Sequence, residues 1–177
     1  MSAAPDLRSH VRDIPDFPRA GIVFKDVTPL LLDGAALRST VDRLAAYARE
    51  RGVDYVVAAE ARGFVLGGAL AVAVDAGFVL ARKPGKLPRE VDSADYRLEY
   101  GIDALEVHSD AMSAGARVLV HDDLLATGGT AEALCRLVEQ AGCEVVGCAF
   151  LIELEFLGGR SRLAGRDVLS LITYESG

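Results

Sequence analysis

Residues 118–130 read VLVHDDLLATGGT, and this stretch indicates the fold class. It holds a short apolar run, then two adjacent carboxylates, then a Thr-Gly-Gly-Thr turn that opens an apolar-periodic stretch. Because buried parallel strands are nearly continuous apolar runs, we expect a strand here that ends at Val120 or His121. Asp122 and Asp123 would then stand at the carboxyl end of the strand, where open α/β sheets bind ligands.

The turn after the two carboxylates predicts an anion-binding site. Gly128 and Gly129 let the backbone adopt positive φ angles and approach a ligand closely. A helix that begins near Thr130 directs its free N–H groups and positive dipole end at the same place, and the hydroxyls of Thr127 and Thr130 add donors. The carboxylates would repel a phosphate, so they suit hydroxyl groups or a metal ion. A ribose 5-phosphate carries both vicinal hydroxyls and a phosphate.

The rest of the chain alternates between strand and helix patterns. Apolar runs predict further strands at 55–59, 78–82, 144–152 and 168–172. Helical patterns appear at 33–52, at about 64–75 after a turn at 60–63, and at 132–141. The alternation predicts an α/β fold, a doubly wound and mainly parallel five-stranded sheet flanked by helices. Outside it we expect an ordered loop or small hood at 17–28, a mobile or ligand-ordered loop at 83–95 and a hairpin at 96–108.

Length and charge narrow the range of partners. The 177 residues fit a single domain, 1–177, and a net charge of −7 argues against binding to nucleic acid or to an anionic membrane. The sequence lacks a long uncharged apolar stretch and an apolar signal core, so we expect a soluble, cytoplasmic protein. The exception to the acidic balance is a basic segment at 82–89, which suits a small polyanionic substrate.

VLVHDDLLATGGT resembles the phosphoribosyl pyrophosphate motif of the type I phosphoribosyltransferases, and DDLLATGGT is similar to the members that act on adenine. The other segments that carry the resemblance are FPRAGIVFKDVTPLL from Phe17, EARGFVLGG from Glu60, RKPGKLPRE from Arg82, YRLEYGIDALEVH from Tyr96 and LGGRSRL from Leu157. Together they extend the similarity over nearly the whole chain.

The resemblance implies a purine salvage reaction. Adenine and 5-phospho-α-D-ribose 1-diphosphate would give AMP and diphosphate, with Mg²⁺ as cofactor held mainly through the substrate and with no direct protein ligand. It also implies a homodimer, a hood at about 10–32 that receives the base, and a flexible lid at about 83–108. Two alternatives remain: a phosphoribosyltransferase for a 6-oxopurine, and a non-catalytic purine-sensing regulator of the same fold. The absence of a basic DNA-binding extension speaks against the regulator.

The resemblance also assigns roles to individual residues. The phosphoribosyl pyrophosphate site would consist of Ala61, Arg62, Gly63, Arg82, Lys86, Asp122, Asp123, Ala126, Thr127, Gly128, Gly129 and Thr130. Arg82 and Lys86 would reach the pyrophosphate, in the same subunit or in the neighbouring one. The adenine site would consist of Val23, Phe24 and Lys25, with Phe24 stacking on the base and the backbone of its neighbours reading the base edge.

Two residues of the lid and one of the strand complete the assignment. Glu99 and Tyr100 would lie on the lid, with Glu99 and Arg62 as catalytic residues and Glu99 as the general acid or base. His121 stands where many family members have an apolar residue. Because alternation places it beside Leu119, we expect a histidine whose hydrogen bonds are satisfied at the end of the strand.

Overall fold

The computed structural model describes residues 5–98 and 101–176. Its centre is a sheet of five strands in the order β4-β3-β7-β8-β9, and each neighbouring pair is parallel. The strands are β3 (Tyr55–Ala59), β4 (Gly77–Ala81), β7 (Arg117–Leu125), β8 (Glu144–Leu154) and β9 (Val168–Tyr174). The predicted fold class is confirmed.

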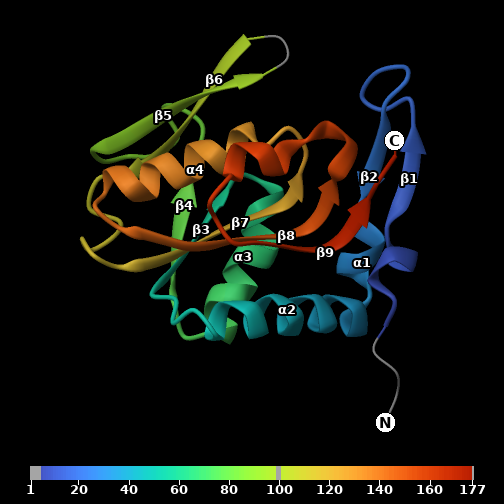
Figure 1. Cartoon of the computed structure of the whole chain (residues 1–177), viewed down its shortest axis with the longest axis horizontal. Helices are drawn as coiled ribbons and strands as arrows, with labels where there is room; N and C mark the ends of the chain where they lie inside the picture. The colour runs from blue at the N-terminus through green and yellow to red at the C-terminus, as the bar shows by residue number, and fades with distance from the viewer. Residues whose placement is uncertain (1–4, 99–100, 177) are drawn as a thin grey trace.

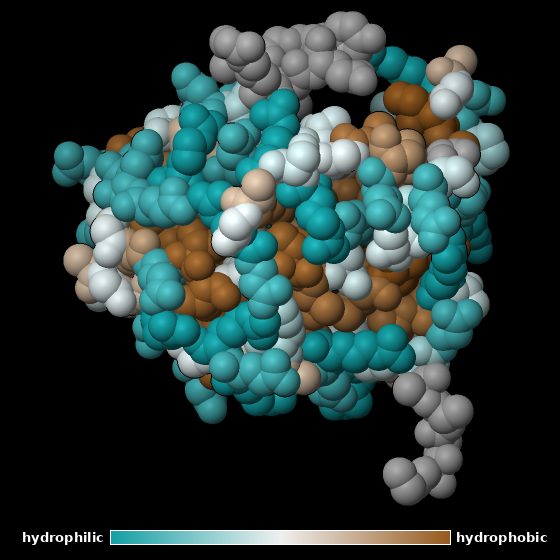
Figure 2. All heavy atoms as spheres, in the orientation of Figure 1, coloured by the Kyte–Doolittle hydropathy of each residue, from teal (hydrophilic) through white to brown (hydrophobic). Residues whose placement is uncertain are grey.

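Helices cover both faces of the sheet (Figure 1). Helix α4 (Gly129–Gln140) lies on one face, and α2 (Gly34–Arg49) and α3 (Arg62–Ala73) lie on the other. Alternate strand residues feed the two cores: Val57 and Val120 belong to the cluster of α4, whereas Val56 and Leu119 belong to the cluster of α2 and α3. Figure 2 shows apolar side chains through the middle of one face, with hydrophilic residues above and below them.

The predicted end of the central strand was wrong. Strand β7 continues to Leu125, so Asp122 and Asp123 lie within the strand and not after it. The cause is its pairing with β8, which runs on through Asp122↔Phe150 to Leu125↔Glu153. The polar residues His121, Asp122 and Asp123 gave a pattern that resembles a strand end, although His121 and Asp123 are buried in the strand.

A small hairpin precedes the sheet. Strands β1 (Arg12–Pro15) and β2 (Val23–Asp26) pair in an antiparallel fashion after a 3-10 turn, η1 (Leu7–His10). The short helix α1 (Thr28–Leu32) then leads to α2, which Asp33 caps by accepting hydrogen bonds from the N–H groups of Ala35 and Ala36. The hairpin stands beside the β9 edge of the sheet (Figure 1).

A second hairpin, β5 (Val91–Leu98) and β6 (Gly101–His108), lies over α4 at the other end of the molecule (Figure 1). Its first strand begins at Val91, within the segment expected to be a loop, because Val91 pairs with His108 and the register continues along both strands. Two further 3-10 turns, η2 (Glu155–Leu157) and η3 (Gly159–Leu163), connect β8 and β9. No helix in the described part of the chain has the length and apolar character needed to cross a membrane.

Candidate active site

An ion pair joins the start of α3 to β7 at the carboxyl edge of the sheet. Arg62, the first residue of α3, places its Nε 2.9 Å from Oδ2 of Asp123 on β7. The Asp123 side chain is only 8% exposed, whereas that of Arg62 is 49% exposed and keeps donors free for a ligand. The adjacent Asp122 accepts a hydrogen bond from the N–H of Asp123 at 2.9 Å.

The electrostatics of the two carboxylates are those of a buried pair. Burial and the charge of Asp123 raise the pKa of Asp122 well above its ordinary value. Burial also raises the pKa of Asp123, although Arg62 acts in the opposite direction. Hydroxyl groups of a ligand that donate to these oxygens would replace the lost hydration, so the pair is suited to binding a diol.

The turn before α3 packs closely against this pair. The peptide bond between Glu60 and Ala61 is cis. Gly63 is buried, and a Cβ at this position would lie 2.8 Å from Oδ1 of Asp122. A side chain here would therefore displace the carboxylate, which explains the glycine in EARGF.

The loop after β7 is hollowed at the start of α4. Gly128, at φ +84°, is the N-cap of α4, and a cavity of about 60 Å³ is lined by residues 124–131. The first N–H groups of α4 are free of intrahelical partners and lie at this loop. The helix end and the glycine backbone together make the position favourable for a phosphate.

The LGGRSRL segment at 157–163 packs its backbone against this loop. A Cβ at Gly128 would overlap the carbonyl oxygen of Gly159, and a Cβ at Gly159 would overlap that of Ala126. The segment is held in turn by Arg160, whose Nε donates to buried Glu153 on β8 at 3.0 Å. This supporting contact was missed by the sequence reasoning, and the paired glycines were its available signal.

The basic segment follows β4 and is tied to the same turn. Arg82 donates to Oε2 of Glu60 through Nε at 3.3 Å and Nη2 at 3.0 Å. The N–H of Lys83 donates to Oε1 of Glu60 at 2.7 Å, and this bond, with Arg82, lowers the pKa of Glu60. Lys86 is exposed and its ammonium forms no ion pair within residues 5–98 and 101–176. Two cations therefore lie near Glu60, which precedes Ala61. Arg82 is held by Glu60, and Lys86 has no ion pair among the described residues.

The hood reaches the site through one aromatic ring. The guanidinium carbon of Arg62 lies 5.1 Å from the centroid of the Phe24 ring, and the Phe17 ring meets Phe24 edge-on at 5.2 Å. A cation over a ring at this distance is attractive. Phe24, Arg62 and Asp123 thus form one continuous line from the hood to the sheet.

Comparison with known proteins identifies the family. Residues 30–167 match the family model described as "Phosphoribosyl transferase domain". A protein of Rubrobacter xylanophilus named adenine phosphoribosyltransferase is 61% identical over 169 residues, which cover 95% of this chain and 91% of the relative. The chain belongs to the adenine phosphoribosyltransferase family.

Solved structures of adenine phosphoribosyltransferases share the whole fold. The enzyme of Thermoanaerobacter pseudethanolicus matches with a TM-score of 0.92 at 50% identity, over 95% of this chain and 98% of that one. The Saccharomyces cerevisiae enzyme, in complex with D-2,5-dideoxy-2,5-imino-altritol 1,6-bisphosphate and adenine, matches with a TM-score of 0.89 at 38% identity, over 93% and 96%.

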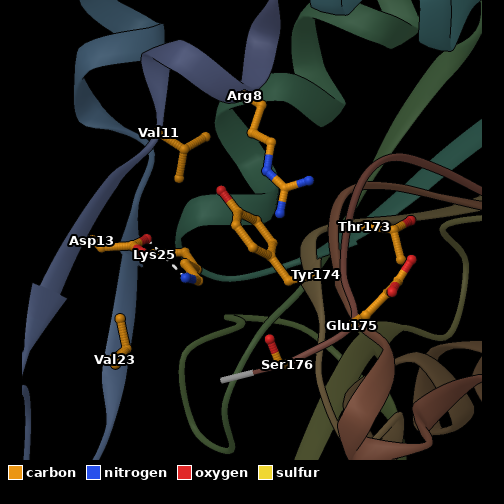
Figure 3. A pocket seen from close by; sticks show the side chains of 9 residues that line it. All are labelled: Arg8, Val11, Asp13, Val23, Lys25, Thr173, Tyr174, Glu175 and Ser176. Atoms are coloured by element: carbon orange, nitrogen blue, oxygen red, sulfur yellow. Dashed lines mark hydrogen bonds and ion pairs between the residues drawn. The ribbon is translucent and has the colours of Figure 1, made fainter.

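Within this adenine phosphoribosyltransferase fold, the side chain of Lys25 turns away from Phe24. It is buried, with Nζ 2.8 Å from Oδ1 of Asp13 and 4.1 Å from the centroid of the Tyr174 ring. Figure 3 shows it, with Val23, in a separate pocket of about 660 Å³ between the hood and the end of β9. Strand alternation therefore leaves only the backbone of Val23 and Lys25 for the side on which Phe24 meets Arg62.

His121 is fully buried within β7. Its Nδ1 lies 2.8 Å from the carbonyl oxygen of Ala149, so Nδ1 carries the proton. Burial lowers the pKa of His121 to about 4. Its Nε2 has no partner in the described part of the chain, so the expectation of a satisfied histidine is met at one of the two nitrogens.

The predicted lid residues cannot be placed relative to the site. Glu99 and Tyr100 lie outside the described residues. Tyr96 and Asp103, which face each other across the second hairpin near the site, were missed. Among residues 5–98 and 101–176, no group of three or more His, Cys, Asp or Glu side chains is arranged to hold a metal ion.

Proposed function

We propose that this protein transfers the phosphoribosyl group of 5-phospho-α-D-ribose 1-diphosphate to adenine, with release of AMP and diphosphate. The observation that carries the proposal is the position of Arg62, 2.9 Å from Asp123 and 5.1 Å from the ring of Phe24. A sugar held at Asp123 and a base held at Phe24 would meet at Arg62. The name of the Rubrobacter relative and the ligands of the yeast enzyme support this choice of substrates.

The sugar phosphate is assigned to β7 and the loop that follows it. Asp122 and Asp123 would accept hydrogen bonds from the ribose hydroxyls. The 5-phosphate would bind the backbone N–H groups at Ala126, Gly128 and Gly129 and the hydroxyls of Thr127 and Thr130. Anchoring the phosphate supplies binding energy remote from the reacting carbon, which can be used to hold that carbon in line.

The leaving diphosphate is assigned to the turn before α3 and to the basic segment. The backbone at Ala61 and Gly63 and the side chains of Arg62, Arg82 and Lys86 would hold it. Displacement at the anomeric carbon builds positive charge on the ring and negative charge on the leaving group. Cations beside the diphosphate and carboxylates beside the ring stabilise both developments.

Adenine is assigned to the hood. Phe24 would stack on the base, and backbone groups of Val23 and Lys25 would read its edge. Strand β2 pairs only with β1 among the described residues, which leaves it an open edge for such contacts. Adenine donates from N6 and accepts at N1, and a 6-oxopurine reverses this pattern. A site built on these hydrogen bonds would reject the wrong base.

Mg²⁺ is proposed as a cofactor bound mainly through the substrate. The donor set fits this mode, because the site offers two carboxylates and one of them is engaged by Arg62. Asp122 and Asp123 would approach the ion only through the ribose hydroxyls they hold. When bound, Mg²⁺ neutralises charge on the diphosphate. Glu99 is proposed as general acid or base and Tyr100 as its lid neighbour, on the basis of the YRLEYG motif alone.

A homodimer is proposed through the outer side of α3 and β4. Val65 and Val72 on α3 are 51% and 80% exposed, and Leu80 on β4 is 43% exposed. Phe78 packs against Gly67 of α3, so Leu80, two residues later, lies on the same side of the strand. An apolar stripe of this kind marks an interface. Because Lys86 follows β4 closely, a partner subunit on this face would lie within reach of its free ammonium.

The experiment that tests the function is a direct assay. The purified protein is incubated with adenine, phosphoribosyl pyrophosphate and Mg²⁺, and AMP and diphosphate are measured. We expect AMP, with hypoxanthine and guanine at least about 10⁴-fold poorer in kcat/KM. Turnover with a 6-oxopurine in place of adenine would move the substrate assignment to the alternative base. Tight purine binding without turnover would favour the regulator.

A further inference from the structure

The carboxylate of Asp103 connects the second hairpin to the basic segment. Oδ2 of Asp103 lies 3.1 Å from Nζ of Lys83 and accepts a hydrogen bond from Oη of Tyr96, also at 3.1 Å. Its other oxygen accepts from the N–H of Ala104 at 2.9 Å. Tyr96 and Asp103 are direct cross-strand partners in β5 and β6, so the backbone register sets this geometry.

The contacts continue from Lys83 toward the turn at 60–61 before α3, to which the diphosphate is assigned; this turn is called the diphosphate turn below. The N–H of Lys83 donates to Glu60 at 2.7 Å, and Glu60 also holds Arg82. The backbones of Arg82 and Glu106 exchange two hydrogen bonds, of 2.9 and 2.7 Å, which fasten the basic segment to β6. Lys83 therefore has one anchor on each side, Asp103 at its ammonium and Glu60 at its backbone.

The contacts continue from Tyr96 toward the loop at 126–130, to which the 5-phosphate is assigned; this loop is called the phosphate loop below. Tyr96 is 9% exposed and lies in the buried cluster that also holds Ala131 of α4, and β5 packs on this helix. Thr130, the neighbour of Ala131, is among the groups that lower the pKa of the Tyr96 hydroxyl. Burial, with Asp103 and Asp122 nearby, raises the pKa of Tyr96 to about 12. A neutral hydroxyl donates one hydrogen bond and can accept another, so Tyr96 can donate to Asp103 while it accepts from Thr130.

We propose that Asp103 is a positioning residue that sets the spacing between the diphosphate turn and the phosphate loop, through Lys83 on one side and Tyr96 on the other. The inference rests on the proposed function, because one substrate carries a phosphate at one end and a diphosphate at the other. A site with its two anion-binding ends already spaced loses less conformational freedom when that substrate binds. Adenine touches neither end of this linkage.

The effect should therefore appear in the binding of one substrate. Asp103→Asn removes the charge that holds Lys83, and Tyr96→Phe removes only the hydroxyl. We expect each to raise the KM for phosphoribosyl pyrophosphate about fivefold, with the KM for adenine and kcat changed less than twofold. Because both act through the same linkage, the double variant should show the effect of the larger single change and not the product of the two.

Two matched controls separate this role from general support of the hairpin. Asp110→Asn breaks the ion pair of Asp110 with Arg89, which joins the turn after β6 to the end of the basic segment without touching Tyr96. Tyr55→Phe removes a hydroxyl that lies 3.5 Å from Ser113, at the other end of the sheet strands. Both should leave the KM for phosphoribosyl pyrophosphate unchanged within about 1.5-fold, the error of such assays.

The outcomes are distinguishable. The parent protein is assayed first, and an inactive parent would overturn the proposed function and this inference with it. With an active parent, affinity for phosphoribosyl pyrophosphate is also measured by calorimetry without adenine, on variants whose thermal unfolding is cooperative. A drop in unfolding temperature or in kcat with unchanged affinity would reduce the linkage to scaffolding and overturn the inference. A selective loss of affinity in Asp103→Asn and Tyr96→Phe, absent from both controls, supports it.

Discussion

Arg62 Nε lies 2.9 Å from Asp123 Oδ2, and the same guanidinium lies 5.1 Å from the ring of Phe24. The pair connects the start of α3 to the end of β7, and a third element, the hood, closes on it from outside the sheet. Burial raises the pKa of Asp123, and the charge of Arg62 beside it opposes this shift without cancelling it.

Asp123→Asn should lower kcat/KM for phosphoribosyl pyrophosphate by at least about tenfold, equivalent to about 1.4 kcal/mol. The amide keeps the shape of the side chain but loses the negative charge. That charge holds Arg62 and would strengthen the proposed hydrogen bond from a ribose hydroxyl. Steady-state kinetics of the parent and of Asp123→Asn measure this change in kcat/KM. Asp167→Asn, which breaks the ion pair of Asp167 with Arg51 far from the site, serves as control. Full activity in a folded Asp123→Asn protein would remove the ribose assignment.

Gly128→Ala should raise the KM for phosphoribosyl pyrophosphate by about tenfold or more, because the new Cβ would meet the carbonyl of Gly159 and the backbone holds φ +84°. Gly158→Ala is the matched control. Its φ is +66°, but nothing lies within 4 Å of its Cβ, so it should cost only about 1 kcal/mol of stability. Equal KM values for the two variants would show that the close contact has no role in binding.

Phe24→Ala should raise the KM for adenine by about tenfold, since stacking of a base on an aromatic ring contributes about 1–3 kcal/mol. The KM for phosphoribosyl pyrophosphate should change much less. Phe24→Tyr keeps the aromatic ring, so its KM for adenine should stay close to the parent's. The comparison shows whether the ring itself is what adenine binding requires. If both variants have the parent's KM for adenine, the base does not stack on this ring.

Acid should destabilise the protein partly through His121. Its pKa is lowered from 6.5 to about 4, so between these values the unfolded chain binds a proton that the folded protein excludes. Stability is full above pH 6.5 and falls as the pH decreases, by about 2 kcal/mol at pH 5. Urea unfolding at pH 8 and pH 5, compared between the parent and His121→Gln, isolates this contribution. A parent and variant with the same pH dependence would contradict the assignment.

Val72→Lys should yield monomers in sedimentation velocity at concentrations where the parent is dimeric, because a charge in a desolvated apolar interface is costly. Leu32 is 87% exposed on α1, outside the α3 and β4 surface, so Leu32→Lys is the matched control and should remain dimeric. A monomeric parent, or a dimer that tolerates lysine at Val72, would place the interface elsewhere or remove it.

The sheet and the order of the loops could be predicted from sequence because each rests on a local pattern. The apolar run before Asp122 and the glycines after Thr127 report their own strand and turn. The length of β7 could not be predicted, because it depends on pairing with β8 that continues past the apolar run.

The contacts that the sequence did not predict are tertiary. Tyr96 and Asp103 become neighbours only through the register of β5 and β6, and neither has a distinctive local pattern. The burial of the Lys25 side chain depends on Asp13 and on Tyr174 from the far end of the chain. A motif identifies the segment that contacts a ligand, but the direction of each side chain requires the fold.

The contact of Gly128 with Gly159 implies that DDLLATGGT is not a self-sufficient cassette. The loop is shaped by a backbone that the ribosome adds after β8, so a nascent chain that has emerged only through α4 would carry the motif without its binding geometry. Grafting the motif onto another parallel sheet would need the LGG turn as well, at the same spacing behind it. The shape of this loop is acquired late, when the segment after β8 folds back against it.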